Sequence, residues 1–168
     1  MKWFSSVGLE RPSDLTNYLL VIMNMLNSKQ IGNVTEMQCM LEFLKLGYNV
    51  LTPYGDCERY DFVVDINGKM YKIQVKTARV AEDKSYIEFN TSSQSTKNGK
   101  MVHYTYDETQ IDYFMTFYSL QAYLIPVNEV SAREKRLRFT PPKNGQIKGI
   151  TFATDYELEK VVNKIIDK

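Results

Sequence analysis

Two runs with apolar residues at alternate positions, Arg59–Ile66 and Lys69–Thr77, flank the dipeptide Asn67-Gly68. An Asn-Gly pair between two such runs is the strongest short-range signal for a β-hairpin. A two-residue turn fixes the register, and this register places Asp61 directly opposite Gln74. The pattern therefore predicts a two-stranded hairpin over these residues.

The two faces of this predicted hairpin differ in chemistry. Directly opposed side chains share a face, and residues two apart on a strand point the same way. Asp61, Gln74 and Lys76 therefore converge on one face, which Asp65 joins nearer the turn. The opposite face is apolar and is predicted to enter the core, with Phe62, Val64, Ile66, Tyr71, Ile73 and Val75.

Helical spacing of apolar residues precedes the hairpin in two segments. Ser13 is placed to cap a helix that runs to about Ser28. After an interruption, Asn33 and Glu36 fit the N-cap and N3 positions of a capping box, and Gly47 is placed to end this second helix. Its predicted buried stripe consists of Val34, Met37, Leu41 and Leu44.

The remaining pattern is mainly that of strands. The segment Thr91–Gly99 is polar and lacks periodicity, so we expect a loop there, and Asp155–Ile166 has the spacing of a final helix. This order predicts an α/β (α+β) domain with a mixed central β-sheet flanked by helices. The other predicted strands are Tyr48–Thr52, Ser85–Asn90, Tyr113–Tyr118, Gln121–Val127 and Arg136–Phe139.

Composition narrows the class of protein. The 168 residues are 43% hydrophobic and 24% charged, as expected for a globular domain. No apolar run approaches the roughly 18 residues of a membrane span, and the first residues lack the apolar core of a signal peptide. We therefore expect an intracellular, cytoplasmic protein with no membrane partner. Cys39 and Cys57 are far apart and lack the spacing of a zinc site, and His103 is the one histidine.

The net charge of +1 does not by itself indicate a nucleic-acid-binding protein. A local excess of basic residues lies between residues 131 and 148, with Glu134 as its one acid. Such a cluster can follow a phosphate backbone, although a solvated strand and loop would look the same. The basic residues are Arg133, Lys135, Arg136, Arg138, Lys143 and Lys148.

The polar face of the hairpin suits phosphodiester hydrolysis. The carboxylate of Asp61 and the amide oxygen of Gln74 are hard ligands of the kind that Mg²⁺ accepts. The ammonium group of Lys76 can orient a water or offset developing charge. Glu36 adds a second carboxylate if its helix packs against the hairpin. The alternative is that these are ordinary polar residues on the solvent side of a sheet.

These residues resemble a known family. Asp61, followed after the turn by Gln74-Val75-Lys76, resembles the signature of PD-(D/E)XK nucleases. From about Gly32 onward, the surrounding sequence resembles the branch of endonucleases that is encoded in bacterial group I introns. The motifs are Gly32-Asn33-Val34-Thr35-Glu36, Leu46-Gly47-Tyr48-Asn49-Val50, Tyr54-Gly55-Asp56, Arg59-Tyr60-Asp61, Ile73-Gln74-Val75-Lys76-Thr77, Ile111-Asp112-Tyr113-Phe114 and Tyr123-Leu124-Ile125-Pro126.

The resemblance implies a restriction-endonuclease-like fold and Mg²⁺-dependent cleavage of double-stranded DNA, with Mn²⁺ as a substitute metal. It implies that Glu36, Asp61, Gln74 and Lys76 form the active site, the first three binding metal. It also implies a homodimer or homotetramer, because cutting two strands needs two sites. The division is then a helical extension over residues 1–31 and a nuclease domain over residues 32–168.

Two departures from the signature keep alternatives open. Tyr60 stands where the family has its proline, and Gln74 replaces an acid. A Holliday-junction resolvase shares much of this pattern, and a nuclease-like domain that only binds DNA or protein would tolerate a neutral Gln74. For DNA contacts we expect Arg79, Lys84, Ser92, Ser93, Lys97, Arg136, Arg138 and Lys143.

Overall fold

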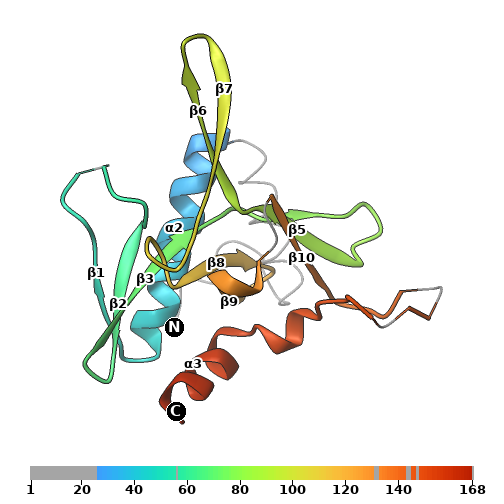
Figure 1. The fold of residues 1–168 in the computed structure, drawn as a ribbon. Helices are drawn as coiled ribbons and strands as arrows, with labels where there is room; N and C mark the ends of the chain where they lie inside the picture. The colour runs from blue at the N-terminus through green and yellow to red at the C-terminus, as the bar shows by residue number, and fades with distance from the viewer. Residues whose placement is uncertain (1–25, 56, 131–132, 143–144, 147, 168) are drawn as a thin grey trace, which may run out of the picture.

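The computed structural model describes residues 26–167 apart from 56, 131–132, 143–144 and 147. The predicted first helix and most of the proposed 1–31 extension lie outside the described residues. The strands are β1 (Asn49–Leu51), β2 (Phe62–Ile66), β3 (Lys69–Val75), β4 (Arg79–Val80), β5 (Tyr86–Asn90), β6 (Ser92–Lys97), β7 (Lys100–Thr105), β8 (Tyr113–Tyr118), β9 (Gln121–Pro126) and β10 (Glu134–Arg138). The α-helices are α2 (Ser28–Lys45) and α3 (Leu158–Ile166) (Figure 1).

A five-stranded mixed sheet forms the centre of the fold. Its order is β1-β2-β3-β8-β9, in which β3 and β8 run parallel and the other neighbours are antiparallel. The predicted hairpin is confirmed as β2–β3, with Ile66 opposite Lys69 and Phe62 opposite Ile73. Asn67 and Gly68 both have positive φ (56° and 83°), as a type I′ turn requires. The predicted mixed central β-sheet is therefore confirmed.

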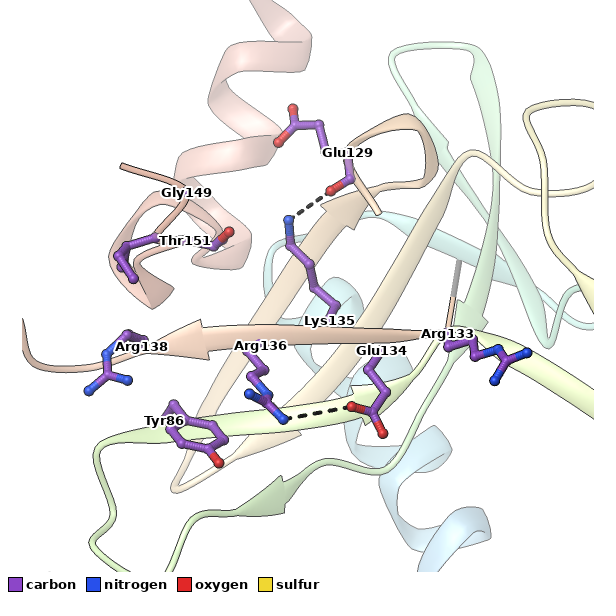
Figure 2. Close-up of a pocket in the computed structure, with 10 residues that line it drawn as sticks. Tyr86, Glu129, Arg133, Glu134, Lys135, Arg136, Arg138, Gly149 and Thr151 are labelled. Carbon is purple, nitrogen blue, oxygen red and sulfur yellow. Dashed lines mark hydrogen bonds and ion pairs between the residues drawn. The ribbon is translucent and has the colours of Figure 1, made fainter. Parts of the chain in front are cut away.

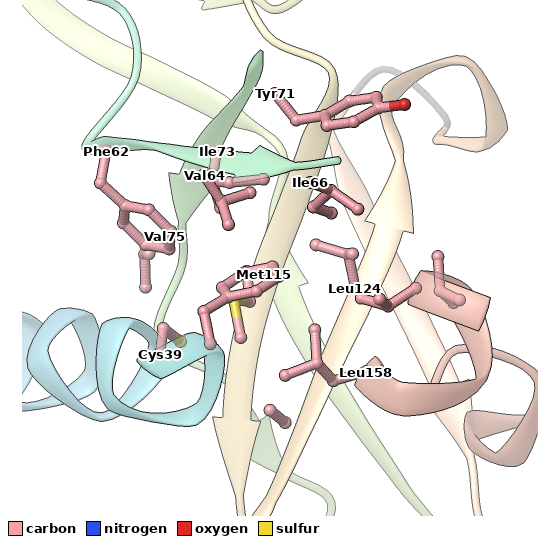
Figure 3. Close-up of a cluster of buried hydrophobic side chains, with 14 residues drawn as sticks. Cys39, Phe62, Val64, Ile66, Tyr71, Ile73, Val75, Met115, Leu124 and Leu158 are labelled. Carbon is pink, nitrogen blue, oxygen red and sulfur yellow. The ribbon is translucent and has the colours of Figure 1, made fainter. Parts of the chain in front are cut away.

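Different layers cover the two faces of this sheet. Both α-helices contribute to one hydrophobic cluster with the apolar face of the hairpin, and Cys39 of α2 and Leu158 of α3 lie in it (Figure 3). The three-stranded sheet β10-β5-β4 contributes to a second cluster that includes Phe114. Phe114 and its neighbour Met115 belong to different clusters because successive residues of β8 point to opposite faces. The central sheet thus lies between a helical layer and a smaller sheet.

The predicted loop Thr91–Gly99 was wrong. Residues in it form β6, which pairs antiparallel with β7 around Asn98-Gly99. Both turn residues have positive φ (51° and 72°), so this is a second Asn-Gly hairpin turn. β6 is polar throughout and both strands are largely exposed on both faces, so their pattern lacks the alternation that marks a half-buried strand.

The predicted start of the second helix was also wrong. Helix α2 begins at Ser28, and its capping box is formed by Asn27 and Gln30. Asn33 and Glu36 therefore lie inside the helix, where Glu36 has no capping role. The predicted end is confirmed: Gly47 has φ of 85°, and the N–H of Tyr48 donates to the carbonyl of Phe43 in a Schellman arrangement.

Helix α2 buries a different stripe from the one predicted. Its buried residues are Thr35, Cys39 and Phe43, spaced four apart. Phe43 is fully buried and packs edge-on against Phe62, which anchors the helix to β2. The predicted stripe instead faces outward and lines a shallow apolar cavity of about 500 Å³. Its members and their exposed fractions are Met37 67%, Leu41 48% and Leu44 54%, with Val34 partly buried.

The other predicted strands are present with small shifts at their ends. The predicted final helix is shorter than expected, because a 3₁₀ turn over Ala153–Asp155 precedes α3. No helix in the described part of the chain is both long and apolar enough to cross a membrane.

Candidate active site

Asp61 lies one residue before β2 and continues its ladder with β3. Its backbone N–H donates to the carbonyl of Ile73 over 2.8 Å. Its Oδ2 oxygen accepts from Gln74 Nε2 and from the backbone N–H of Val75, each at 2.5 Å. The register predicted from the turn thus brings Asp61 and the buried Gln74 into direct contact.

Helix α2 carries Glu36 to this pair. The hydroxyl of Thr77, just after β3, donates to the hydroxyl of Thr35 over 3.3 Å, so the helix is joined to the strand end beside Glu36. Burial raises the pKa of the Glu36 carboxyl, and the charge of Asp61 raises it further. The two carboxylates are therefore close enough to repel each other.

The pKa of Asp61 is also raised, chiefly by burial. The N–H of Val75, the charge of Lys76 and the amide of Gln74 lower this pKa, but they do not fully offset the burial. Burial raises the pKa of the Cys39 thiol, and the charges of Asp61, Glu36 and Glu42 raise it further. A cation bound between these two carboxyl groups would favour their ionised forms and offset their mutual repulsion. The raised pKa values therefore fit a cation site.

Lys76 follows β3 on the same side as Gln74. Its backbone N–H donates to the carbonyl of Met115, and its Nζ lies 3.4 Å from the hydroxyl of Tyr106 and 5.1 Å from the centre of that ring. The guanidinium group of Arg59 lies over the same ring at 4.1 Å. Tyr106 therefore contacts two cationic side chains, those of Arg59 and Lys76, beside the hairpin. Sequence reasoning missed this role of both residues: Arg59 stands in the motif Arg59-Tyr60-Asp61 without an assigned role, and no motif includes Tyr106.

The side chains near Asp61 fit a divalent hard cation. Glu36, Asp61 and Gln74 supply oxygen ligands of the type that Mg²⁺ takes. In the described part of the chain, no group of three or more His, Cys, Asp or Glu residues is placed to hold a metal ion. The amide of Gln74 is the further oxygen ligand beside the two carboxylates. Its Nε2 now faces Asp61, and a half-turn of the terminal amide would present the oxygen instead.

A cavity of about 550 Å³ opens beside Lys76. Three of the residues expected to contact DNA line it together with Lys76, namely Arg79, Ser92 and Ser93. Two others lie apart from it: Lys84 is exposed in the turn between β4 and β5, and Lys97 is at the end of β6. The structure therefore brings only part of the expected DNA-contacting set next to the candidate active site.

Arg136 and Arg138 lie on β10, along a separate cavity of about 810 Å³ (Figure 2). Glu88 partly neutralises this surface, because it pairs with Arg136 at 3.0 Å and with Arg79 at 3.8 Å. Lys135 points inward, where its Nζ donates to the carbonyl of Glu129, and burial lowers its pKa. Ion pairing of Arg136 and the inward position of Lys135 therefore take up part of the positive charge of this segment. Lys143 lies outside the described residues.

Comparison with known proteins bears on this arrangement. A family model described as PD-(D/E)XK endonuclease matches residues 26–159. No curated protein matches the chain. Among solved structures, a bacterial homing endonuclease, I-Ssp6803I, has a TM-score of 0.70 at 21% sequence identity, covering 85% of this chain and 98% of its own. Likeness at this identity shows a shared fold.

Proposed function

Because the chain belongs to the PD-(D/E)XK endonuclease family, we propose that it is a Mg²⁺-dependent endonuclease that hydrolyses phosphodiester bonds in double-stranded DNA, of the homing or restriction type. The observation that carries the proposal is the convergence of Asp61, Gln74 and Lys76, with Glu36 brought in by α2. Mn²⁺ is the expected substitute metal. The division at residue 31 and the cytoplasmic location stay predictions.

Each residue has a distinct proposed role. When bound, Mg²⁺ supplies positive charge that polarises the scissile phosphate and lowers the pKa of an attacking water. Asp61, Glu36 and the amide oxygen of Gln74 would hold the ion. Lys76, steadied by Tyr106, keeps an ammonium beside the phosphate and offsets charge that develops there.

The neutral Gln74 sets the charge of this site. An acid at this position would add a third negative charge against the buried Asp61, whereas the amide adds none. We therefore expect weaker metal binding than a three-carboxylate site would give, and a single essential ion.

The DNA path is proposed from the cavity beside Lys76. Arg79, Ser92 and Ser93 would contact the strand that is cut, since they share that cavity. Lys84, Lys97, Arg136 and Arg138 would contact phosphates farther along the duplex, as would Lys143.

Cutting both strands calls for two copies, so we propose a homodimer or a pair of such dimers. The outward apolar stripe of α2 is the proposed contact between copies. Contiguous apolar surface of this kind marks an interaction site, and a second copy presenting the same stripe would cover it symmetrically. Leu51 of β1, 46% exposed, adds to the apolar surface of the chain.

The test is cleavage of a duplex DNA pool, with sequencing of the ends produced. We expect cleavage with Mg²⁺ and none with EDTA, and a loss of about a hundredfold or more in Asp61→Asn and Lys76→Ala. Asp65→Asn is the matched control, because Asp65 lies in β2 on the same face of the hairpin but accepts from the N–H of Gly68 in the turn. Cleavage that survives both Asp61→Asn and Lys76→Ala would rule this site out.

One observation favours a second candidate function, a nuclease-like domain that binds DNA without cutting it. In the structure Gln74 presents its amide nitrogen to Asp61, which is the arrangement of a satisfied hydrogen bond. Salt-dependent duplex binding with no cleavage in Mg²⁺ or Mn²⁺ would identify this function. A branched DNA junction in the same assay separates a junction resolvase, which would cut it in preference to linear duplex.

A further inference from the structure

The ribbon formed by β6 and β7 stands apart from the rest of the fold. It projects from the body of the protein, and in the described residues neither strand pairs with a third (Figure 1). Every residue from Gln94 to Met101 is exposed. A two-stranded ribbon is only marginally stable in water, and this one adds no side chains to either core cluster. Its features therefore point to a partner.

The ribbon has the charge of a surface that meets a polyanion. Residues 91–106 contain no Asp or Glu, although the whole chain has 20 acidic residues against 21 basic ones. Lys97 and Lys100 face each other beside the turn at its tip. A segment free of acids in a nearly neutral chain can approach phosphates without repulsion.

The two faces of the ribbon carry different groups. Gln94 lies directly opposite His103 on one face, where both side chains are exposed. Ser95 lies opposite Val102 on the other face. Gln is suited to paired hydrogen bonds with the edge of adenine, and His offers a further donor or acceptor beside it.

The base of the ribbon is fastened next to the candidate active site. Arg59 donates to Ser93 Oγ at 2.7 Å and to the carbonyl of Thr105 at 3.0 Å, so it holds both strands. The same guanidinium stacks on Tyr106, which contacts Lys76. If a phosphate of a DNA duplex lies at Lys76, the neighbouring groove of that duplex would therefore face this ribbon.

We propose that the β6–β7 ribbon enters the major groove and reads the target sequence, with Gln94 and His103 on base edges and Lys97 and Lys100 on phosphates. The major groove, about 12 Å wide, admits a two-stranded ribbon. Six residues per strand span about 20 Å at 3.4 Å per residue, which is enough to reach across it. This inference rests on the proposed function, because it takes duplex DNA as the substrate.

The experiment selects duplexes from a randomised pool on the full chain in EDTA, which prevents cleavage. Affinity for the selected duplex and for its single-base variants is then measured. In Gln94→Ala and His103→Ala we expect about a tenfold or greater loss on the selected duplex, and weaker discrimination at one or two adjacent base pairs. Lys97→Ala and Lys100→Ala should weaken all duplexes alike and reduce the salt slope by about 0.9 each.

Two matched controls accompany these variants. Ser95→Ala removes a neutral hydroxyl from the face that carries Lys97 and Lys100, and it should leave base preference unchanged. Lys164→Ala removes an exposed cation from α3, and it should leave both affinity and preference unchanged. Thermal melting checks that every variant keeps the stability of the wild type. If the wild type selects a sequence that Gln94→Ala and His103→Ala select equally well, the ribbon inference fails while the proposed function stands. If the wild type binds no duplex, both fail.

Discussion

Gln74 donates its Nε2 amide to Oδ2 of Asp61 over 2.5 Å, across the two strands that the Asn67-Gly68 turn joins. The same oxygen accepts the N–H of Val75, while burial raises the pKa of this carboxyl. The amide therefore stabilises a buried carboxylate without adding charge. A cation bound between these residues would stabilise the carboxylate in place of the amide. Metal binding should therefore change the stability of the protein.

Gln74→Glu should destabilise the metal-free protein and tighten Mg²⁺ binding. The substitution places a second carboxylate against Asp61 where an amide now donates, and we expect a loss of about 1–3 kcal/mol in the free energy of unfolding. Denaturant unfolding in EDTA and then in Mg²⁺ measures both effects. Equal stability of variant and wild type in EDTA would show that the two side chains are not in contact.

Asp61→Asn should stabilise the metal-free protein at neutral pH. The pKa of Asp61 is raised on folding, so between its unfolded and folded values the folded chain holds more protons. The free energy of unfolding therefore falls as pH rises through that window and stays low above it. The gain in Tm from Asp61→Asn should be largest at pH 7 and shrink on acidification. A gain that grows as the pH falls would contradict this account.

Tyr106 should affect the rate of DNA cleavage because it positions Lys76. Tyr106→Phe keeps the ring under both cations and loses the hydroxyl contact at 3.4 Å, so we expect a fall of about 2- to 10-fold in kcat. Tyr106→Ala also removes the ring and should cost about 30-fold or more. KM should change little in Tyr106→Phe. A change confined to KM would mean that Tyr106 contacts DNA instead of positioning Lys76.

The sequence predicted the hairpin register because two independent signals agreed there. The Asn67-Gly68 turn fixed the pairing, and an apolar face that includes Ile73 allowed no slip. Asn98-Gly99 is the same turn signal, but β6 is polar on both faces and gave it no supporting pattern. A solvent-exposed ribbon has no core to impose alternation, so periodicity could not reveal it.

Helix α2 shows a different limit of sequence reasoning. Asn27 with Gln30 and Asn33 with Glu36 both fit a capping box, and only the structure shows that the first pair forms it. The stripe Thr35, Cys39, Phe43 is less apolar than the stripe of Met37 and Leu41 beside it, yet it is the one that meets the sheet. Periodicity finds a face but does not say whether it meets the core or a partner.

Leu41→Ser should weaken self-association. Leu41 lies in the outward stripe of α2 and is 48% exposed, so the substitution removes little from the core. Analytical ultracentrifugation should show a dimer or tetramer for the wild type and a shift to monomer for the variant, with similar Tm. Met70→Ser is the control, since Met70 is 53% exposed on the hairpin and away from α2. If the wild-type protein is monomeric at high concentration, the proposed contact between copies does not form.

The central claim is that Asp61, Gln74 and Glu36 hold a divalent cation beside Lys76. Anomalous diffraction from a crystal soaked in Mn²⁺ tests it most directly. The account predicts one peak within ligand distance, about 2–2.5 Å, of an Asp61 carboxylate oxygen and of the Gln74 amide oxygen, with Glu36 directed toward it. An absent peak, or one bound away from these residues, would contradict the account.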